Sequence, residues 1–260
     1  MKTLRELESR SITVLLTDID GTLTDNGRLP PHSYESLWRL KKSGLHVIPV
    51  TGRPAGWCEL IARLWPVDGV VGENGAFYFR LEKKMKRWFA RNQKQRQEDR
   101  KKLKAVREDV LRHIPGSGIA SDQFCRLFDL AIDFSEDVSA LNADAVQRIV
   151  STFKKHGANA KVSNIHVNGW YGEYDKLSTC QLYLKNEFEF TPEQMKERCA
   201  FIGDSPNDEP MFRFFPNSVA VSNIKEFLPQ LKSPPGYLTE GAEADGFKEL
   251  ADHLLAFDRS

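Results

Sequence analysis

The sequence lacks the features that mark a disulfide scaffold, a zinc module or a membrane protein. Its four cysteines (Cys58, Cys125, Cys180 and Cys199) are widely spaced and include no CxxC pair. Neither a disulfide framework nor a zinc site is therefore indicated. No run approaches the ~18 apolar residues that a membrane span needs. Residues 1–10 are charged and lack an apolar segment, so we expect no secretory signal and a cytoplasmic protein.

The sequence also lacks an excess of charge of either sign. Its 260 residues carry a formal net charge of +1, which implies no global attraction to nucleic acid or to a membrane. With 40% apolar residues, a chain of this length can bury one large core or two modest ones. Residues 82–112 depart from the balance, with thirteen Lys and Arg against five Asp and Glu. Such a stretch can bind an acidic partner, but it is more often the solvated face of a helix.

What the sequence does contain is an alternation of short apolar runs and amphipathic segments. Runs at 14–17, 45–50 and 68–71 predict strands, with helices over 31–42 and from Pro54 between them. The same alternation resumes after residue 171, where strands are expected at 199–202, 218–221 and 236–238, and helices from 174, over 209–214 and over 242–257. Short connections between such elements favour an α/β fold with a doubly wound parallel sheet.

The middle of the chain predicts an inserted α+β unit. Its expected elements are strands at 76–81 and 84–89, a helix from about Asn92, a long strand at 123–134, a helix at 143–156 and a strand at 160–170. A unit with this element order can fold as an insert. We therefore expect a core made of residues 1–79 and 171–260, interrupted by an inserted domain at 80–170.

Carboxylates follow two of the predicted core strands. Asp18 and Asp20 come directly after the first strand, and Asp204 and Asp208 follow the strand at 199–202. Buried carboxylates are costly unless they are compensated, and the carboxyl ends of the strands are where ligands bind in an α/β sheet. Mg²⁺ is held by one or two carboxylates together with substrate phosphate and water. The pattern therefore suits a Mg²⁺ site.

Two further groups favour an anion at the same sheet edge. Thr51-Gly52-Arg53 ends the second strand and precedes a helix, so its hydroxyl and backbone N–H groups can hold an anion. Lys176 opens a later helix, where a cation opposes the helix dipole unless an anion partners it. Each also has an ordinary interpretation, a helix-capping Thr in the first case and an exposed Lys in the second.

Taken in order, DIDGT, TGR, a single Lys opening a helix and GDSPND resemble the motifs of the haloacid dehalogenase superfamily, subfamily IIB, the Cof-like and sucrose-phosphatase-like phosphatases. The resemblance covers the core throughout, whereas the insert matches in placement and element order only. It implies a Rossmann-like doubly wound core with an inserted α+β cap domain. It also implies a Mg²⁺-dependent phosphatase of a small phosphomonoester, such as a sugar phosphate or a glycosyl-polyol phosphate.

The resemblance assigns roles to the four acids. Asp18 is the nucleophile that forms an aspartyl-phosphate, and Asp20 is the general acid and base. Asp204 completes the Mg²⁺ site with the Asp18 carboxylate and the Asp20 backbone carbonyl. Asp208 supports the metal site by holding its ligands in position.

The resemblance also assigns the phosphate-holding groups. Thr51 and Lys176 bind the oxygens of the transferring phosphoryl group, with the Gly52 amide beside them. One departure bears on Lys176: the family commonly follows this Lys with Gly, whereas this chain has Leu177.

Substrate specificity is expected to depend on the last strand of the insert. If this segment is extended, His166, Asn168 and Trp170 share one face, and it leads back to the core near the site. Polar groups beside an aromatic ring suit a sugar, although the same face could simply meet solvent. The candidate substrate contacts are Arg53, Asn74, His166, Asn168 and Trp170.

Two alternatives stay open at this point. A phosphomutase is one, because phosphomannomutases share the core and a similar cap. A nucleic-acid-binding protein that uses residues 82–112 is the other, but every catalytic position keeps a competent residue. The expected partner is therefore a small phosphorylated metabolite, with no nucleic acid and no membrane.

Overall fold

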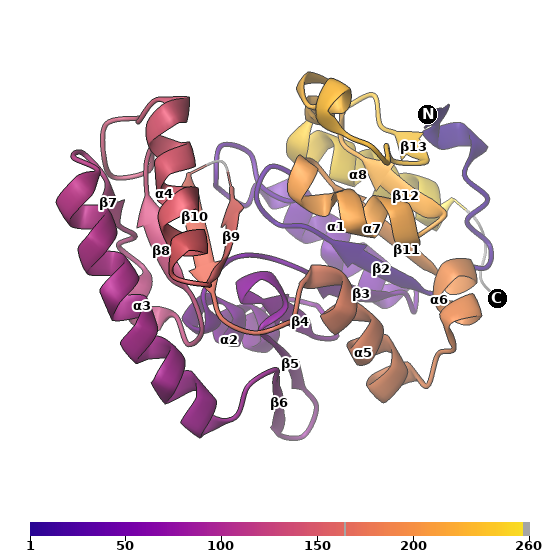
Figure 1. Ribbon diagram of the computed structural model, residues 1–260. Helices are drawn as coiled ribbons and strands as arrows, with labels where there is room; N and C mark the ends of the chain where they lie inside the picture. Colours follow the sequence, from indigo (N-terminus) through magenta and orange to yellow (C-terminus); the bar gives the residue numbers. More distant parts are fainter. Residues whose placement is uncertain (164, 257–260) are drawn as a thin grey trace.

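Six parallel strands form the sheet on which the larger lobe is built (Figure 1). The computed structural model describes residues 1–163 and 165–256. Neighbouring strands in the sheet all pair in parallel. In spatial order the strands are β1 (Lys2–Thr3), β13 (Tyr237–Leu238), β12 (Asn217–Ala220), β11 (Cys199–Gly203), β2 (Val14–Thr17) and β3 (His46–Pro49).

Helices cover both faces of this sheet, which confirms the predicted doubly wound fold. Successive residues of a strand point to opposite faces, so Leu15 packs into one apolar cluster and Val14 and Leu16 into the other. The first cluster is closed by α1 (Pro31–Lys42), α2 (Ala55–Leu64) and α8 (Glu243–Leu255), and the second by α5 (Lys176–Phe188), α6 (Pro192–Arg198) and α7 (Glu209–Phe214). Strands buried on both faces read as near-continuous apolar runs, as β2 does apart from Thr17 and as β11 does.

An antiparallel hairpin extends the larger lobe beyond β3. Strand β4 (Val70–Gly72) meets the end of β3 through a parallel bridge between Val50 and Val71. It also pairs with β5 (Phe77–Leu81), which pairs with β6 (Met85–Phe89). Strand pairing therefore joins residues up to 89 to the larger lobe, whereas the domain limits drawn from the sequence, at 79 and 171, stay predictions.

The smaller lobe is a four-stranded antiparallel sheet backed by two helices, here called the cap. In spatial order its strands are β7 (Gly118–Ile119), β8 (Leu130–Asp133), β10 (His166–Trp170) and β9 (Asn159–Val162). Helices α3 (Gln93–His113) and α4 (Ala143–Lys155) pack on one face of this sheet through a separate apolar cluster. The opposite face is left to meet the larger lobe (Figure 1).

Two strand predictions in the cap are wrong in detail. Residues 123–134 were expected to be one strand, but Gln123–Cys125 form a 3-10 turn and Phe124 is 88% exposed. The apolar alternation there comes from a loop that buries ionic groups. Residues 160–170 were also expected to be one strand, and they form two, β9 and β10, paired antiparallel. Helix α6 was not anticipated, since seven residues carry little periodicity.

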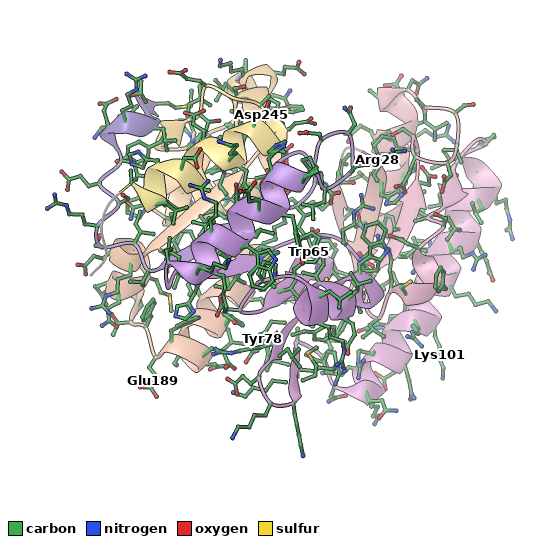
Figure 2. All side chains as sticks on the ribbon, turned by 180° about the vertical axis from the view of Figure 1, so that it is seen from behind. Arg28, Trp65, Tyr78, Lys101, Glu189 and Asp245 are labelled. Atoms are coloured by element: carbon green, nitrogen blue, oxygen red, sulfur yellow. The ribbon has the colours of Figure 1, made fainter. Side chains whose placement is uncertain are left out.

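The basic segment is largely a solvated helix face. Leu103, Val106 and Val110 of α3 are buried against the cap sheet, while its Lys and Arg side chains lie mostly on the outside, as Figure 2 shows for Lys101. Leu111 of the same helix lies outside this buried stripe and is 40% exposed. Among the described residues, no helix combines the length and apolar content that crossing a bilayer requires.

Gly75 generates a prediction about how the fold positions α5. It has φ +103°, and an added Cβ would overlap the carbonyl of Asp175, the residue that caps α5. Gly44 has a similar φ of +85° with open space around it. We expect Gly44→Ala to lower the free energy of unfolding by ~1–2 kcal/mol, because alanine would have to adopt a left-handed backbone conformation. Gly75→Ala should cost clearly more, because the backbone of Asp175 must also move.

Urea unfolding of both variants measures this difference. Equal losses of unfolding free energy in the two variants would show that the backbone of Asp175 can move away from residue 75 at little cost. The close contact between Gly75 and α5 would then not fix the position of the helix.

Candidate functional site

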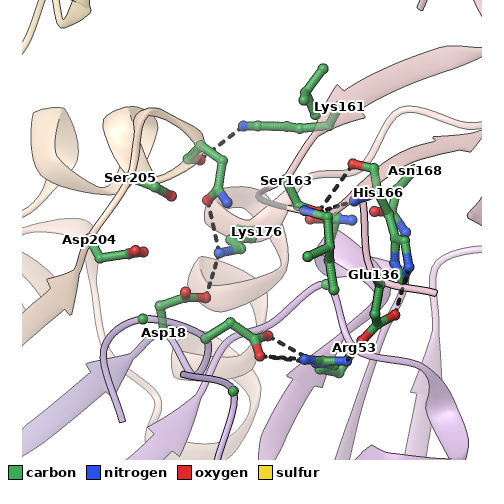
Figure 3. Close-up of a pocket in the computed structure, with 18 of the residues that line it drawn as sticks. Asp18, Arg53, Glu136, Lys161, Ser163, His166, Asn168, Lys176, Asp204 and Ser205 are labelled. Carbon is green, nitrogen blue, oxygen red and sulfur yellow. Dashed lines mark hydrogen bonds and ion pairs between the residues drawn. The ribbon is translucent and has the colours of Figure 1, made fainter. Parts of the chain in front are cut away.

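A cavity of about 370 Å³ lies between the two lobes, at the carboxyl ends of the parallel strands (Figure 3). The larger lobe supplies loops that follow β2, β3 and β11, together with the first residue of α5. The cap supplies β9, β10 and the loop after β8. Residues that the sequence places far apart therefore meet here, among them Asp18, Arg53, Lys176 and Asp204 from the larger lobe and His166 and Asn168 from the cap.

Asp18 and Lys176 form a buried ion pair on the larger-lobe side of the cavity. The Lys176 Nζ lies 2.7 Å from Asp18 Oδ1 and 2.9 Å from Asp208 Oδ1. Burial raises the pKa of Asp18 to about 7, against the opposing effect of the lysine. Burial alone would lower the pKa of Lys176, but the two carboxylates outweigh it and raise that pKa. The helix-opening lysine thus has the anionic partners that its position requires.

The loop after β11 adds two further buried acids. Asp208 Oδ2 accepts a hydrogen bond of 3.2 Å from the Asp204 amide, which ties the loop together. Asn223 Nδ2 lies 3.3 Å from Asp204 Oδ2. Burial, reinforced by Asp18 and Asp208, raises the pKa of Asp204 well above its usual range. Lys176 pairs with Asp208, so the charge of these two carboxylates is compensated only in part.

The three acids can hold a hard cation. Asp18, Asp204 and Asp208 each offer one oxygen, and these oxygens all lie within 4.8 Å of one another. Gly21 contributes by its size, because an added Cβ would overlap Asp204 Oδ2. All-oxygen donors with excess negative charge suit Mg²⁺. The residues present therefore fit the metal that the sequence led us to expect.

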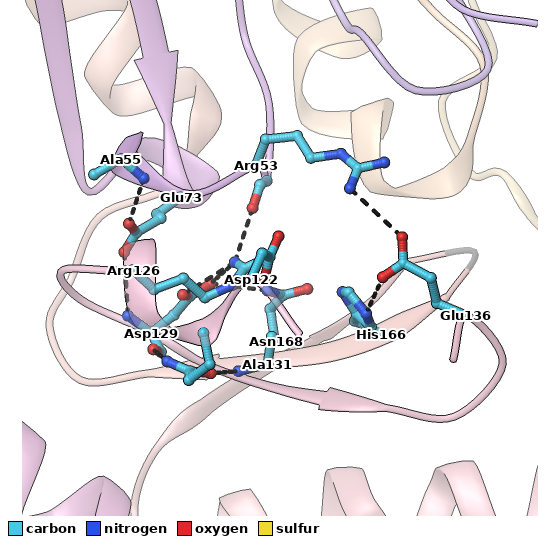
Figure 4. Close-up of polar contacts among 12 residues, drawn as sticks. Arg53, Ala55, Glu73, Asp122, Arg126, Asp129, Ala131, Glu136, His166 and Asn168 are labelled. Carbon is cyan, nitrogen blue, oxygen red and sulfur yellow. Dashed lines mark hydrogen bonds and ion pairs between the residues drawn. The ribbon is translucent and has the colours of Figure 1, made fainter. Parts of the chain in front are cut away.

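Asp20 faces the same cavity and is paired with Arg53. The Arg53 Nη2 lies 2.7 Å and its Nε 3.1 Å from Asp20 Oδ1. Arg53 continues the contact into the cap, with Nη1 3.8 Å from Glu136 Oε1. Glu136 Oε2 in turn lies 2.9 Å from His166 Nε2 (Figure 4). Burial lowers the pKa of His166, and Glu136 opposes that effect.

Glu136 was missed at the sequence level. It lies in a cap turn whose backbone is held by Asp133, whose carboxylate accepts hydrogen bonds from the amides of Ser135, Glu136 and Asp137. An Asp followed within four residues by further polar residues is a turn signal. That signal could have located the turn, but not its approach to Arg53.

The predicted phosphate-binding loop takes a compact turn. The Thr51 hydroxyl oxygen accepts a hydrogen bond of 3.0 Å from the Arg53 amide, and Thr51 is fully buried, outside the cavity lining. Gly52 and Asn74 do line the cavity. Asn74 has φ +55° and its side chain lies against Gly52. The loop thus presents backbone rather than the threonine side chain to the cavity.

Trp170 is placed differently from the expectation. His166 and Asn168 line the cavity, but Trp170 does not. Its ring stacks on Tyr174, with centroids 5.9 Å apart, inside the apolar cluster of the larger lobe. At this position the chain is crossing back to the larger lobe, so the side chain fills the junction. Trp170 is therefore not retained as a substrate contact.

A buried carboxylate joins the two lobes behind the cavity. Glu73 is fully buried and accepts hydrogen bonds from Ala55 N at the start of α2 and from Leu127 N and Phe128 N of the cap, at 2.7–2.9 Å (Figure 4). Burial and the nearby Asp129 raise its pKa to about 7. One side chain thus satisfies backbone donors from both lobes.

Arg126 makes a second link between the lobes. Its guanidinium is buried between Asp122 and Asp129, and Nη1 donates to the Gly52 carbonyl at 3.1 Å. Asn168 Nδ2 donates to the same Asp129 at 2.8 Å. The cap strand that lines the cavity and the loop after β3 are therefore connected through one ionic cluster. Sequence reasoning missed this cluster, because it assigned the segment to a strand.

Glu73→Gln tests the junction. The amide would place an N–H₂ group among backbone donors, so we expect a loss of ~1–3 kcal/mol in unfolding free energy, the cost of buried groups left unpaired. Glu59→Gln is the matched control, because Glu59 is partly exposed and pairs with Arg63 and Arg87. The unfolding free energy of Glu59→Gln should fall by no more than about 1 kcal/mol. A Glu73→Gln variant as stable as the control would contradict the role of Glu73.

Comparison with known proteins shows what the chain is similar to in sequence and in fold. The family model of haloacid dehalogenase-like hydrolases matches residues 15–110. A phosphoglycolate phosphatase of Methanobrevibacter smithii is 27% identical over 94% of this chain and 99% of its own. The solved Thermoplasma acidophilum protein 0175 has a TM-score of 0.73 at 18% identity, covering 95% of this chain and 99% of that one. A solved haloacid dehalogenase-like hydrolase from Bacteroides thetaiotaomicron has a TM-score of 0.68 at 17% identity, covering 95% of this chain and 100% of that one.

Proposed function

We propose that the chain is a phosphoric monoester hydrolase of the haloacid dehalogenase superfamily, subfamily IIB, and that it acts as a Mg²⁺-dependent phosphatase through an aspartyl-phosphate on Asp18; the family match over residues 15–110 and the phosphatase relatives support this proposal. The observation that carries the proposal is the buried contact of 2.7 Å between Asp18 and Lys176 at a cavity lined by further acids. A nucleophile, a cation and an acid/base in one site are the parts that phosphoryl transfer requires.

Asp18 would attack the phosphorus while Lys176 offsets charge on the phosphoryl oxygens. Lys176 binds Oδ1 of Asp18, and no donor among the described residues hydrogen-bonds Oδ2. As the bond from Asp18 to phosphorus forms, the bond from phosphorus to the leaving oxygen breaks. The Gly52 amide and the Lys176 ammonium, both from residues that line the cavity, would hold the phosphoryl group in position.

Asp20 would supply the proton that the leaving oxygen needs. It lines the cavity with its side chain 37% exposed, so it can reach a bound ester. In the second step it would take a proton from the water that attacks the aspartyl-phosphate, which releases inorganic phosphate. Asp20 Oδ1 accepts hydrogen bonds from Nε and Nη2 of Arg53, so Asp20 would have to loosen this contact to reach the leaving oxygen.

Asp18 and Asp204 would hold Mg²⁺, with Asp208 orienting the loop and the Asp20 backbone carbonyl as the further ligand that the family resemblance implies. The bound ion would supply charge neutralisation for the transferring phosphoryl group. It would also offset the excess negative charge that now raises the pKa of Asp204. Burial of all three acids is what makes the requirement for a cation strong.

The substrate is proposed to be a small phosphomonoester of the cytosol. A cavity of about 370 Å³ suits such a molecule, and its leaving group would contact four residues of the lining, Arg53, Asn74, His166 and Asn168. The class includes the sugar and glycosyl-polyol phosphates expected from the sequence, and phosphoglycolate, for which several relatives are named. Those relatives are phosphatases, so we favour hydrolysis over the phosphomutase alternative.

Asp18→Asn tests the nucleophile. The change is nearly isosteric, so the fold should persist while phosphate release from a panel of phosphomonoesters falls to background. Asp144→Asn is the control, because Asp144 is exposed on α4 of the cap, away from the cavity. An Asp18→Asn enzyme that keeps the parent's turnover would exclude the aspartyl-phosphate mechanism.

A second experiment concerns the metal. EDTA should abolish phosphate release and added Mg²⁺ restore it. Asp204→Ala should raise the Mg²⁺ concentration needed for half-maximal rate at least ~10-fold, since one of few charged ligands is lost. Asp252→Ala, which removes a partly exposed carboxylate of α8, should leave the requirement unchanged. Undiminished activity in chelator would rule out the proposed metal.

A further inference from the structure

One cation of the cavity lacks the anionic partner that the others have. Arg53, Arg126 and Lys176 each lie within 3.2 Å of at least one carboxylate oxygen. Lys161 lines the same cavity, and among the described residues no carboxylate lies within 4.0 Å of its Nζ. Its hydrogen bond of 2.9 Å goes to a neutral group, the backbone carbonyl of Asn207. Lys161 is thus an ammonium held in place but not neutralised.

The cap sheet directs the Lys161 side chain into the cavity. It lies on β9 directly opposite Asn168 of β10, so the two side chains share the face that meets the larger lobe (Figure 3). The bond to Asn207 fixes the ammonium over the loop that carries Asp204 and Asp208. The groups assigned to the phosphoryl come from the larger lobe, whereas Lys161 comes from the cap, the side on which a leaving group would extend.

The energetics favour an anionic ligand at this ammonium. A half-buried cation without a counter-ion in contact is costly, and burial together with the nearby Lys176 lowers the pKa of Lys161, against the opposing effect of Asp208, Asp175 and Glu209. An ammonium has three N–H donors, and the Asn207 carbonyl accepts one of them. A carboxylate could accept from the others and neutralise the charge. A neutral hydroxyl would supply hydrogen bonds but no charge.

We propose that Lys161 binds a carboxylate on the leaving group, so that the preferred substrates are phosphomonoesters of hydroxy acids. This inference rests on the proposed phosphatase function and narrows its substrate class. The nearby acids do not take this ammonium as a partner, because Asp208, the one that acts on it most, is paired with Lys176, and among the described residues no carboxylate oxygen lies within 4.0 Å of the Lys161 Nζ. The same ammonium chemistry could instead serve the transferring phosphoryl group, and the experiment separates the two.

Two esters that differ in one group provide the test. 2-Phosphoglycolate and 2-hydroxyethyl phosphate share a two-carbon frame and exchange a carboxylate for a hydroxymethyl group. We expect the parent enzyme to prefer the acid. Lys161→Ala should lower kcat/KM for 2-phosphoglycolate ~10–100-fold, the range for a lost charged hydrogen bond, and change the neutral ester less than ~3-fold. Lys161→Arg should recover part of the loss.

The controls separate binding from folding and from catalysis. Lys155→Ala removes an exposed cap lysine and should alter neither ester. Urea midpoints check that Lys161→Ala folds, and Lys161→Gln replaces it if that midpoint drops sharply. Calorimetric binding of both esters to the Asp18→Asn enzyme, with and without Lys161→Ala, measures the same discrimination without turnover.

Each outcome has a distinct meaning. Equal losses for both esters, with weaker inhibition by inorganic phosphate, would assign Lys161 to the phosphoryl group and overturn the inference. No preference for the acid in the parent enzyme would overturn it too. If no ester of the phosphomonoester panel is hydrolysed but binding still depends on Lys161 and the carboxylate, the assignment of Lys161 to a carboxylate stands and the phosphatase proposal fails.

Discussion

Three carboxylates buried around one ammonium are the constraint on which the rest of the site depends. Asp18, Asp204 and Asp208 are each at most 5% exposed, and Lys176 pairs with only Asp18 and Asp208 among them. Such a cluster is tolerable only if its members are held by rigid elements and a cation completes it. The parallel strands supply the rigidity, because β2 and β11 are neighbours and end at the same edge.

The cap is tied to this centre by polar groups rather than by apolar contact alone. Glu73 bonds backbone of both lobes, and Arg126 reaches the carbonyl of Gly52 beside the phosphate position. A loop of the cap therefore shares hydrogen bonds with the loop that would hold the substrate. Fixing the shape of the cavity in this way requires buried ionic groups that are fully partnered, as the guanidinium of Arg126 is.

The sequence predicted the core well because its signals are local. Apolar runs, a Gly or Pro at a turn and carboxylates after strands each occupy a few adjacent residues, and the structure brings Asp18, Lys176 and Asp204 to one cavity. The cap was predicted less well for the same reason. Glu136, Arg126 and Lys161 acquire their neighbours from strand register and loop paths, which short patterns do not encode. The loop at 123–129 has the alternating pattern of a strand because it buries charged residues between apolar ones.

The pairing of β9 with β10 has a consequence for how such a protein could change its choice of ligand over evolution. Lys161 and Asn168 face the cavity together only because they are opposite each other, while Val167, one residue away, packs in the apolar cluster of the cap. A slip of one residue in this pairing would exchange the two rows, as in any two-faced sheet. New specificities are therefore more accessible through substitutions within the cavity-facing row than through insertions or deletions in the hairpin, which would endanger folding and recognition at once.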